Sequence, residues 1–164
     1  MIQHPIEPIY DKNSKVLILG SFPSVKSREA GFFYGHPQNR FWKVLAAVCK
    51  ADVPESVEEK KAFLLGNHIA VWDVIKSCDI EGSADSSIKN VIPNDLRKIL
   101  ECADIKQIYV NGKKAEELYN KYIFAELKRK AVCLPSTSPA NAAWSIDRLV
   151  AKWKDIITYL ETEA

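Results

Sequence analysis

The sequence predicts a three-layer α/β/α fold, in which helices cover both faces of a central, mostly parallel four-stranded sheet. Two observations lead to this prediction. Short apolar runs alternate with segments of helical periodicity along the chain, and neither an internal repeat nor a linker interrupts the alternation. The length of 164 residues suits one domain, so we expect a single unit over residues 1–164.

The four predicted strands are short apolar runs followed by turn residues. The first run, Val-Leu-Ile-Leu, is apolar throughout and ends at Gly20, which is typical of a strand that is buried on both faces. The predicted strands cover residues 15–20, 69–72, 105–110 and 131–134.

Helical patterns fill most of the intervals between these runs. Residues 41–48 place four apolar side chains on one helical face, and Ser56 with Glu59 forms a capping-box pattern ahead of a second helix. Further helices are expected over residues 93–100, 113–123 and 146–160. Residues 21–38 and 76–90 are polar or rich in Ser, Pro and Gly, and we expect loops there.

Composition excludes several classes of protein. No apolar run approaches the ~20 residues of a membrane span, and the N-terminus lacks a basic region followed by an apolar block, so we expect a cytoplasmic protein without a membrane partner. The 4 cysteines and 3 histidines lack the spacing of metal ligands, and no metal or other cofactor is expected. The net charge of +2 neither indicates nor forbids a nucleic-acid partner, because a local basic face would be enough.

The predicted topology brings four segments together. In open α/β sheets a ligand binds beyond the carboxyl ends of the strands. Segments 20–24, 73–78, 111–114 and 134–141 should therefore converge at one edge of the sheet.

The loop before residue 42 carries aromatic residues that are expensive to expose unless they pack or bind something. Tyr34, next to a glycine, could lie flat against a planar base, and such stacking is worth ~1–3 kcal/mol per base. Asn39 and Arg40 open the next helix, where backbone N–H groups favour anions. Alternatively Asn39 is a local helix cap, and for Phe41 and Trp42 we accept a place in the core.

Two further segments combine turn residues with hydroxyl groups. Residues 134–141 (L-P-S-T-S-P-A-N) suit the binding of a phosphate backbone, or they form a plain Ser/Pro loop. Residues 20–24 (G-S-F-P-S) form a tight turn whose amides could face a ligand, or a plain strand-to-loop turn.

The chain resembles the uracil-DNA glycosylase superfamily in five strings, which follow one another as G-S-F-P-S, F-Y-G-H-P-Q-N-R-F-W, V-W-D-V, N-G-K-K-A and L-P-S-T-S-P-A-N. Within the superfamily it is most similar to the hypoxanthine-DNA glycosylase (DNA-deoxyinosine glycosylase) family. The resemblance runs from about Val16 to Trp153. It implies a uracil-DNA glycosylase-like fold and a monomeric, cofactor-free enzyme of base excision repair, whose partner is DNA that contains deoxyinosine, as a duplex or a single strand.

The resemblance also implies roles for individual residues. Relatives often carry Asp or Asn in the first motif to position water, whereas this chain has no carboxylate there. That departure matches the hypoxanthine branch, in which the asparagine matching Asn39 is implicated in catalysis. The candidate residues for catalysis are Asn39, Ser21 and Ser24, those for base binding are Phe22, Tyr34 and Asp73, and those for DNA binding are Pro23, Lys113, Ser136, Thr137, Ser138 and Asn141.

Asp73 has two interpretations. An ionised carboxylate at this position could accept the N1–H of hypoxanthine, which adenine lacks; the alternative is a helix or turn cap. The closing motif at residues 136–141 lacks the histidine of the strict uracil enzymes, which weakens any prediction of fast uracil removal.

Three other functions stay open at this point. The same fold could act mainly on uracil or on G·T and G·U mismatches, because the string H-P-x-N-R-F-W also resembles the mismatch-specific branch. A non-catalytic nucleic-acid-binding module would fit the missing acid in the first motif. A small-molecule hydrolase using Ser21 or Ser136 ranks last, since the sequence has no G-x-S-x-G elbow.

Overall fold

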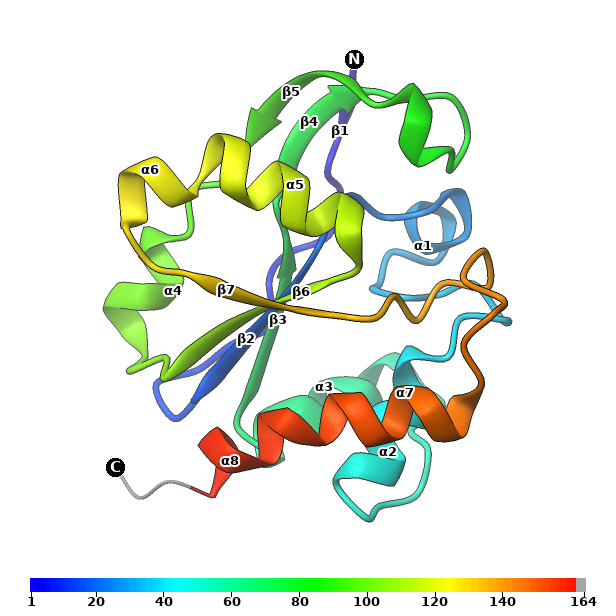
Figure 1. Cartoon of the computed structure of the whole chain (residues 1–164), viewed down its shortest axis with the longest axis vertical. Helices are drawn as coiled ribbons and strands as arrows, with labels where there is room; N and C mark the ends of the chain where they lie inside the picture. Colours follow the sequence, from blue (N-terminus) through cyan, green and yellow to red (C-terminus); the bar gives the residue numbers. More distant parts are fainter. Residues whose placement is uncertain (162–164) are drawn as a thin grey trace.

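The computed structural model describes residues 1–161, and its centre is a parallel four-stranded sheet (Figure 1). The strand order is β3-β2-β6-β7, and all three neighbouring pairs are parallel. The prediction of a four-stranded parallel sheet between helices is confirmed. The strands are β2 (Val16–Gly20), β3 (Ile69–Asp73), β6 (Gln107–Asn111) and β7 (Ala131–Leu134).

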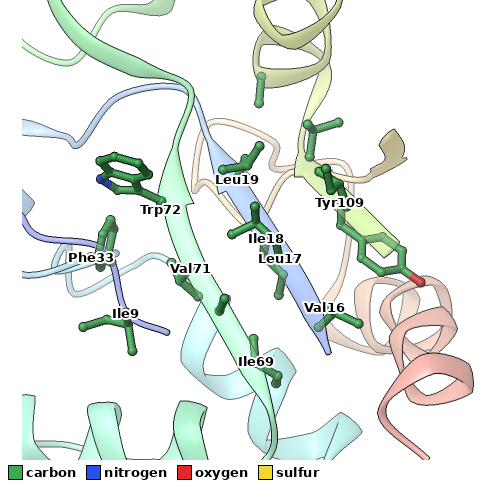
Figure 2. Close-up of a cluster of buried hydrophobic side chains, with 14 of the residues drawn as sticks. Ile9, Val16, Leu17, Ile18, Leu19, Phe33, Ile69, Val71, Trp72 and Tyr109 are labelled. Atoms are coloured by element: carbon green, nitrogen blue, oxygen red, sulfur yellow. The ribbon is translucent and has the colours of Figure 1, made fainter. Parts of the chain in front are cut away.

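The core lies on both faces of the inner strands. Every residue of β2 and β3 is buried, which explains why their sequences are apolar runs without alternation. Figure 2 shows aliphatic side chains leaving β2 in both directions, with Trp72 and Phe33 on one flank and Tyr109 on the other. Phe41 and Trp42 are buried, as expected.

Helices cover the two faces of the sheet (Figure 1). One layer contains α2 (Phe41–Val48), α3 (Val57–Gly66) and α7 (Ile146–Trp153), and the other contains α4 (Arg97–Cys102), α5 (Lys113–Tyr122) and α6 (Phe124–Leu127). The predicted capping box of Ser56 and Glu59 is present at the start of α3. The single helix expected over residues 146–160 is wrong in detail, because a 3₁₀ turn at Lys154–Ile156 separates α7 from α8 (Ile157–Leu160).

A second, antiparallel sheet was missed. It consists of β1 (Ile2–Gln3), β4 (Ile75–Asp79) and β5 (Lys89–Pro93), in the order β1-β4-β5. The expected loop over residues 76–90 is therefore wrong at both ends, which belong to β4 and β5, and residues 80–88 connect these strands. The register of β4 and β5 shifts along the pair and β5 is largely exposed, so its residues lack the alternation that marks a half-buried strand. Pro93 ends β5, and for this reason the following helix starts at Arg97, not at Pro93.

The first expected loop also contains a helix. Helix α1 (Val25–Ala30) begins after Ser24, whose side chain caps it, and ends at Gly31 with a left-handed φ of 71°. The helix has only six residues, too short for its periodicity to stand out in the sequence.

Two further findings concern membrane-spanning helices and the state of the cysteines. No helix within residues 1–161 is long and apolar enough to cross a membrane. All four cysteines are free, with Cys78 buried and Cys102 exposed.

Candidate active site at the carboxyl edge of the sheet

A cavity of about 480 Å³ opens where the carboxyl ends of the parallel strands meet, and its volume is typical of small-molecule sites. The four segments expected to converge do so: the cavity receives residues from the ends of β2, β3 and β6 and from the loop after β7. All the predicted site residues except Asn141 line it; they are Ser21, Phe22, Pro23, Ser24, Tyr34, Asn39, Asp73, Lys113, Ser136, Thr137 and Ser138.

Tyr34 forms a rigid aromatic wall. Its ring stacks on Phe41, with 3.8 Å between the ring centroids and 15° between the planes, so one face of the ring is backed by the core. Its backbone has a φ of 52°, an uncommon conformation that tertiary contacts must maintain. The hydroxyl is buried and meets no partner in hydrogen-bond geometry among the described residues, although the Asn111 side chain lies near it and opposes the rise of its pKa. Burial, followed by the nearby charge of Asp73, raises the pKa of this hydroxyl, which therefore stays protonated.

Asn39 is oriented by a chain of polar contacts through two other side chains, Thr137 and Asn111. Its Oδ1 accepts hydrogen bonds from the backbone N–H of Phe41 at 2.9 Å and from the hydroxyl of Thr137 at 2.9 Å. Asn111 donates from Nδ2 to the Thr137 hydroxyl at 3.0 Å and accepts from the Thr137 N–H at 3.1 Å. Since the Phe41 N–H requires an acceptor, the oxygen of Asn39 must face it, which leaves the NH₂ group for the cavity.

The structure shows a supporting role for Thr137 in addition to the predicted contact with DNA. Thr137 is 0% exposed and its hydroxyl is engaged by Asn39 and Asn111, so its side chain supports Asn39, and the contact with DNA stays a prediction. The local-cap interpretation of Asn39 is correct, but the cap also fixes the amide in the cavity wall. Asn111 was missed as a site residue because an Asn-Gly pair after a strand is an ordinary turn signal.

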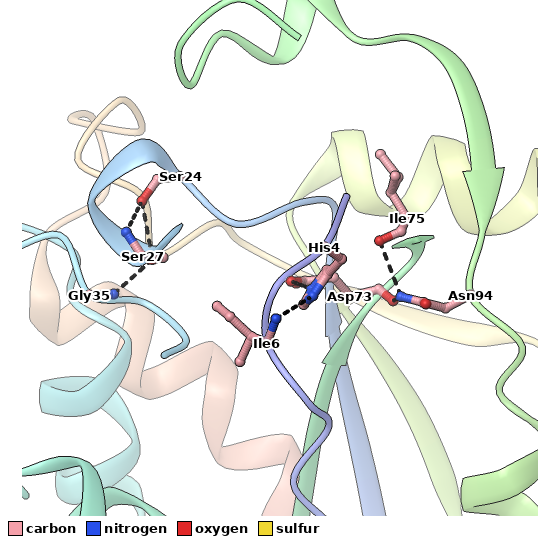
Figure 3. A network of polar contacts seen from close by, with 8 residues as sticks. All are labelled: His4, Ile6, Ser24, Ser27, Gly35, Asp73, Ile75 and Asn94. Carbon is pink, nitrogen blue, oxygen red and sulfur yellow. Dashed lines mark hydrogen bonds and ion pairs between the residues drawn. The ribbon is translucent and has the colours of Figure 1, made fainter. Parts of the chain in front are cut away.

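Asp73 ends β3 and is held by a histidine from the N-terminal segment. The Nε2 of His4 lies 2.7 Å from Oδ2 of Asp73, and the two side chains are 3% and 5% exposed (Figure 3). The backbone carbonyl of Asp73 accepts from Asn94 Nδ2 at 2.9 Å. Within residues 1–161 the carboxylate caps no helix or turn, so the geometry does not support the alternative interpretation. His4 was missed because nothing in its local sequence links it to a residue 69 positions away.

The hydroxyls of the first motif differ in their surroundings. Ser24 accepts from the Ser27 N–H at 3.2 Å and shares a 3.1 Å contact with the Ser27 hydroxyl, which in turn accepts from Gly35 N–H at 2.9 Å (Figure 3). Through Ser27, Ser24 thus connects α1 to the loop that carries Tyr34. The hydroxyl of Ser21 makes no hydrogen bond within the described part of the chain and lines the cavity. Catalytic roles for both serines stay predictions.

The tip of the β4–β5 hairpin forms a wall that the sequence did not indicate. Residues 83–86 line the cavity. Two hydrogen bonds hold this tip against α1, one from Arg28 to the carbonyl of Gly82 at 2.5 Å and one from the Val25 N–H to the Ser83 hydroxyl at 2.9 Å. Arg28 also lies 5.7 Å from the ring centroid of Phe22, so the same cation supports two walls.

The loop after β7 is fixed by Arg40. The guanidinium donates to the carbonyls of Ser138 at 2.9 Å, Asn141 at 3.0 Å and Trp144. The backbone N–H groups that were expected to favour an anion at the start of α2 are engaged within the protein, because the Arg40 N–H donates to the Thr137 carbonyl at 3.1 Å and the Phe41 N–H donates to Asn39. Asn141 lies outside the cavity lining and donates to the Ser136 carbonyl at 3.0 Å, which stabilises the loop from within.

The cavity contains groups for binding a planar polar molecule and for orienting water. One wall is an aromatic ring, the floor carries a carboxylate, and an amide NH₂ faces the interior. Lys113 lies exposed beside the cavity. No group of His, Cys, Asp and Glu side chains in residues 1–161 could hold a metal ion.

Comparison with known proteins places this geometry in context. Residues 7–158 match the model of the family described as the uracil DNA glycosylase superfamily. A hypoxanthine DNA glycosylase from Methanosarcina acetivorans is 32% identical over 161 residues, which are 97% of this chain and 100% of that protein. Another from Methanosarcina barkeri is 35% identical over 136 residues, 82% of this chain and 85% of that protein. A solution NMR structure of a proposed uracil DNA glycosylase from M. acetivorans has a TM-score of 0.83 and 33% identity, and covers 99% of this chain and 100% of that one.

Proposed function

Because the chain belongs to the uracil DNA glycosylase superfamily, we propose that it is a monofunctional DNA glycosylase that removes hypoxanthine from deoxyinosine in DNA during base excision repair. Both relatives named above as hypoxanthine DNA glycosylases support this substrate. The observation that carries the proposal is the cavity itself: a backed aromatic ring, a carboxylate acceptor and an amide donor line one space at the carboxyl edge of the sheet.

A base in this cavity must have left the double helix, because the glycosidic bond cannot be reached inside the stack. The free face of Tyr34 suits a flipped purine, which would complete a stack of base, Tyr34 and Phe41. The carboxylate of Asp73 suits the N1–H of hypoxanthine as an acceptor. Adenine has a lone pair at N1, and a carboxylate oxygen repels it. The site thus accepts the deaminated purine and rejects the normal one.

Hydrolysis breaks the bond between C1′ of the sugar and N9 of the base. The electron pair of the bond leaves with the base, water adds to C1′, and a proton from that water balances the charge of the departing base. Positive charge develops on the sugar and negative charge on the base before these steps are complete. The products are free hypoxanthine and an abasic site.

Asn39 takes part in this reaction as a hydrogen-bond donor. Its Oδ1 is occupied by two donors, so it cannot receive a proton from water, and its NH₂ can hold the water or the departing base. Residues 20–24 contain no carboxylate that could act as a base. With the Asp73 carboxylate assigned to the base and none in the first motif for water, we propose a dissociative reaction, in which the glycosidic bond breaks ahead of the attack by water.

The remaining candidates surround the entrance of the cavity. We assign the loop with Ser136 and Ser138, together with Lys113, to the phosphate backbone of the damaged strand. The substrate is deoxyinosine-containing DNA, as a duplex or a single strand. We further propose that the protein works as a monomer in the cytoplasm, where the chromosome of a prokaryotic cell would lie.

One assay tests this function. Duplexes with a single deoxyinosine, deoxyuridine or G·T mismatch are incubated with the protein and then treated with alkali, which cleaves abasic sites. We expect strand breaks chiefly at deoxyinosine. Binding without any abasic product would instead identify a non-catalytic module and would overturn the proposal.

A uracil or mismatch glycosylase is the second candidate. Uracil also presents an N–H next to a carbonyl group, so the acceptor on Asp73 could bind it too. The name of the M. acetivorans protein whose structure resembles this chain also points in that direction. Cleavage at deoxyuridine in preference to deoxyinosine in the same assay would support this candidate.

A further inference from the structure

We propose that His4 is a positioning residue for base recognition: it holds Asp73 so that one carboxylate oxygen is presented to the flipped base as an acceptor. This inference rests on the proposed function and adds to the site a residue that lies outside every motif of the sequence. His4 does not line the cavity, so it acts only through Asp73.

The hydrogen bonds of His4 define its tautomer. The backbone N–H of Ile6 donates to Nδ1 at 3.1 Å, so Nδ1 carries no proton (Figure 3). A neutral imidazole with an unprotonated Nδ1 has its hydrogen on Nε2. The 2.7 Å contact with Asp73 is therefore a donation from Nε2–H to Oδ2, and the aspartate is the acceptor.

The other oxygen of Asp73 lies over Gly20. Strands β2 and β3 are in register at Gly20 and Asp73, and a β-carbon built on Gly20 would lie only 2.5 Å from Oδ1. The absence of a side chain at residue 20 lets the carboxylate reach across the neighbouring strand toward the first motif. No group in residues 1–161 donates a hydrogen bond to Oδ1. Asp73 lines the cavity, so a base that fills the cavity would displace water from this oxygen, and an N–H of the base would supply the donor that it then needs.

His4 itself is rigidly held. Strand β1 pairs with β4, and the His4 N–H donates to the Lys76 carbonyl at 2.8 Å. The imidazole packs against the rings of Phe22 and Phe33, with centroids 5.8 and 6.0 Å away. The second sheet thus brings the N-terminal segment next to Asp73 and fixes the imidazole that donates to this carboxylate.

A comparison of two substrates tests the proposal. Wild-type, His4→Phe and His4→Gln proteins are assayed in single turnover on duplexes that contain deoxyinosine or 2′-deoxynebularine, whose purine has no proton on N1. Phenylalanine keeps an aromatic ring between Phe22 and Phe33 but removes the donor, whereas the amide of glutamine can still donate to Asp73.

We expect His4→Phe to cleave deoxyinosine about ten- to a hundredfold more slowly, as for the loss of a hydrogen bond to a charged group. Cleavage of deoxynebularine, which is slow in wild-type because the carboxylate repels the lone pair at N1, should not fall in this variant, and His4→Gln should recover most of the loss with deoxyinosine. Equal losses on both substrates, or no recovery with glutamine, would show that His4 is only structural and would overturn the proposal.

A double-mutant cycle provides a second measurement. If His4 acts through Asp73, His4→Phe should have no further effect in an Asp73→Asn background; additive losses would contradict the proposal. His68→Asn is the matched control, since His68 lies beyond the opposite end of the sheet and its φ of 63° suits asparagine. If the wild-type protein releases no hypoxanthine, the proposed function itself is wrong. If the wild-type protein is active but the losses in the two variants add, only the proposed role of His4 is wrong.

Discussion

At the scale of a single residue, Asn39 shows how packing leaves an amide with one face for a substrate. Its oxygen is held by Phe41 and Thr137, so only the NH₂ can face a substrate. We expect Asn39→Ala to slow single-turnover cleavage of deoxyinosine by about 10²–10³-fold, as for the loss of a preorganised donor at a site of developing charge. Duplex affinity, measured by fluorescence anisotropy, should be largely retained. Unchanged turnover would remove Asn39 from the mechanism.

A substitution of Thr137 distinguishes two roles of this residue, the orientation of the Asn39 amide and a contact with DNA. Thr137→Val keeps the shape but removes the hydroxyl that links Asn39 to Asn111. We expect slower cleavage with unchanged duplex affinity and a stability loss of about 1–3 kcal/mol, because the buried amides lose a partner. Single-turnover rates, anisotropy and urea unfolding measure the three quantities. Weaker binding at an unchanged rate would instead indicate a direct contact with DNA.

Two substitutions of Tyr34 test the contributions of its ring and of its hydroxyl independently. Tyr34→Ala removes the stacking surface and should weaken the handling of the flipped base by ~1–3 kcal/mol, visible as a slower single-turnover rate. Tyr34→Phe keeps the ring on Phe41 and removes a hydroxyl that meets no partner in hydrogen-bond geometry among the described residues, so its rate should stay close to wild-type. If the two variants behave alike, the ring is not a stacking surface.

At the scale of elements, Arg40 couples the start of α2 to the loop after β7. Three loop carbonyls accept from its guanidinium, a geometry that lysine cannot reproduce. We expect Arg40→Lys to raise the Kd for duplex DNA by roughly tenfold, since the loop loses hydrogen bonds to a charged group. Lys43→Arg is the control for an exchange of lysine and arginine by itself, because Lys43 is exposed on α2, which follows Arg40. Equal affinity of Arg40→Lys and wild-type would show that the loop needs no such support.

The elements predicted correctly are those with a strong local signal. Strands β2 and β3 are continuous apolar runs, and α3 starts at a capping box, so each can be recognised within a few residues. The β4–β5 pair has no such signal. The register of the pair shifts and β5 is largely exposed, so no periodic pattern of apolar residues marks β5 in the sequence. The strand is held by its pairing with β4.

At the scale of the whole molecule, buried tyrosines should make the fold sensitive to alkali. Burial raises the pKa of Tyr109 and Tyr119, and their hydroxyls donate to Asp155 at 2.8 Å and to the Arg129 carbonyl at 2.5 Å. The unfolded chain ionises near the ordinary tyrosine pKa of about 10, before the folded chain does, so stability is complete below that pH and falls as pH rises above it.

Unfolding in urea at neutral pH and above the ordinary tyrosine pKa measures this loss. Tyr109→Phe should be less stable than wild-type at neutral pH, because it lacks the bond to Asp155, but its stability should fall less steeply in alkali. Parallel pH dependences of the variant and the wild-type protein would contradict this expectation.

The sequence by itself determined the four parallel strands, the edge of the sheet where the site lies, and most of the residues that line the cavity, because apolar periodicity and turn residues act over short distances. Only the tertiary structure decided what these residues do there. His4 meets Asp73 across 69 positions, and Thr137 meets Asn39 across 98. The partner of a polar side chain depends on where distant segments pack, and no local pattern records that choice.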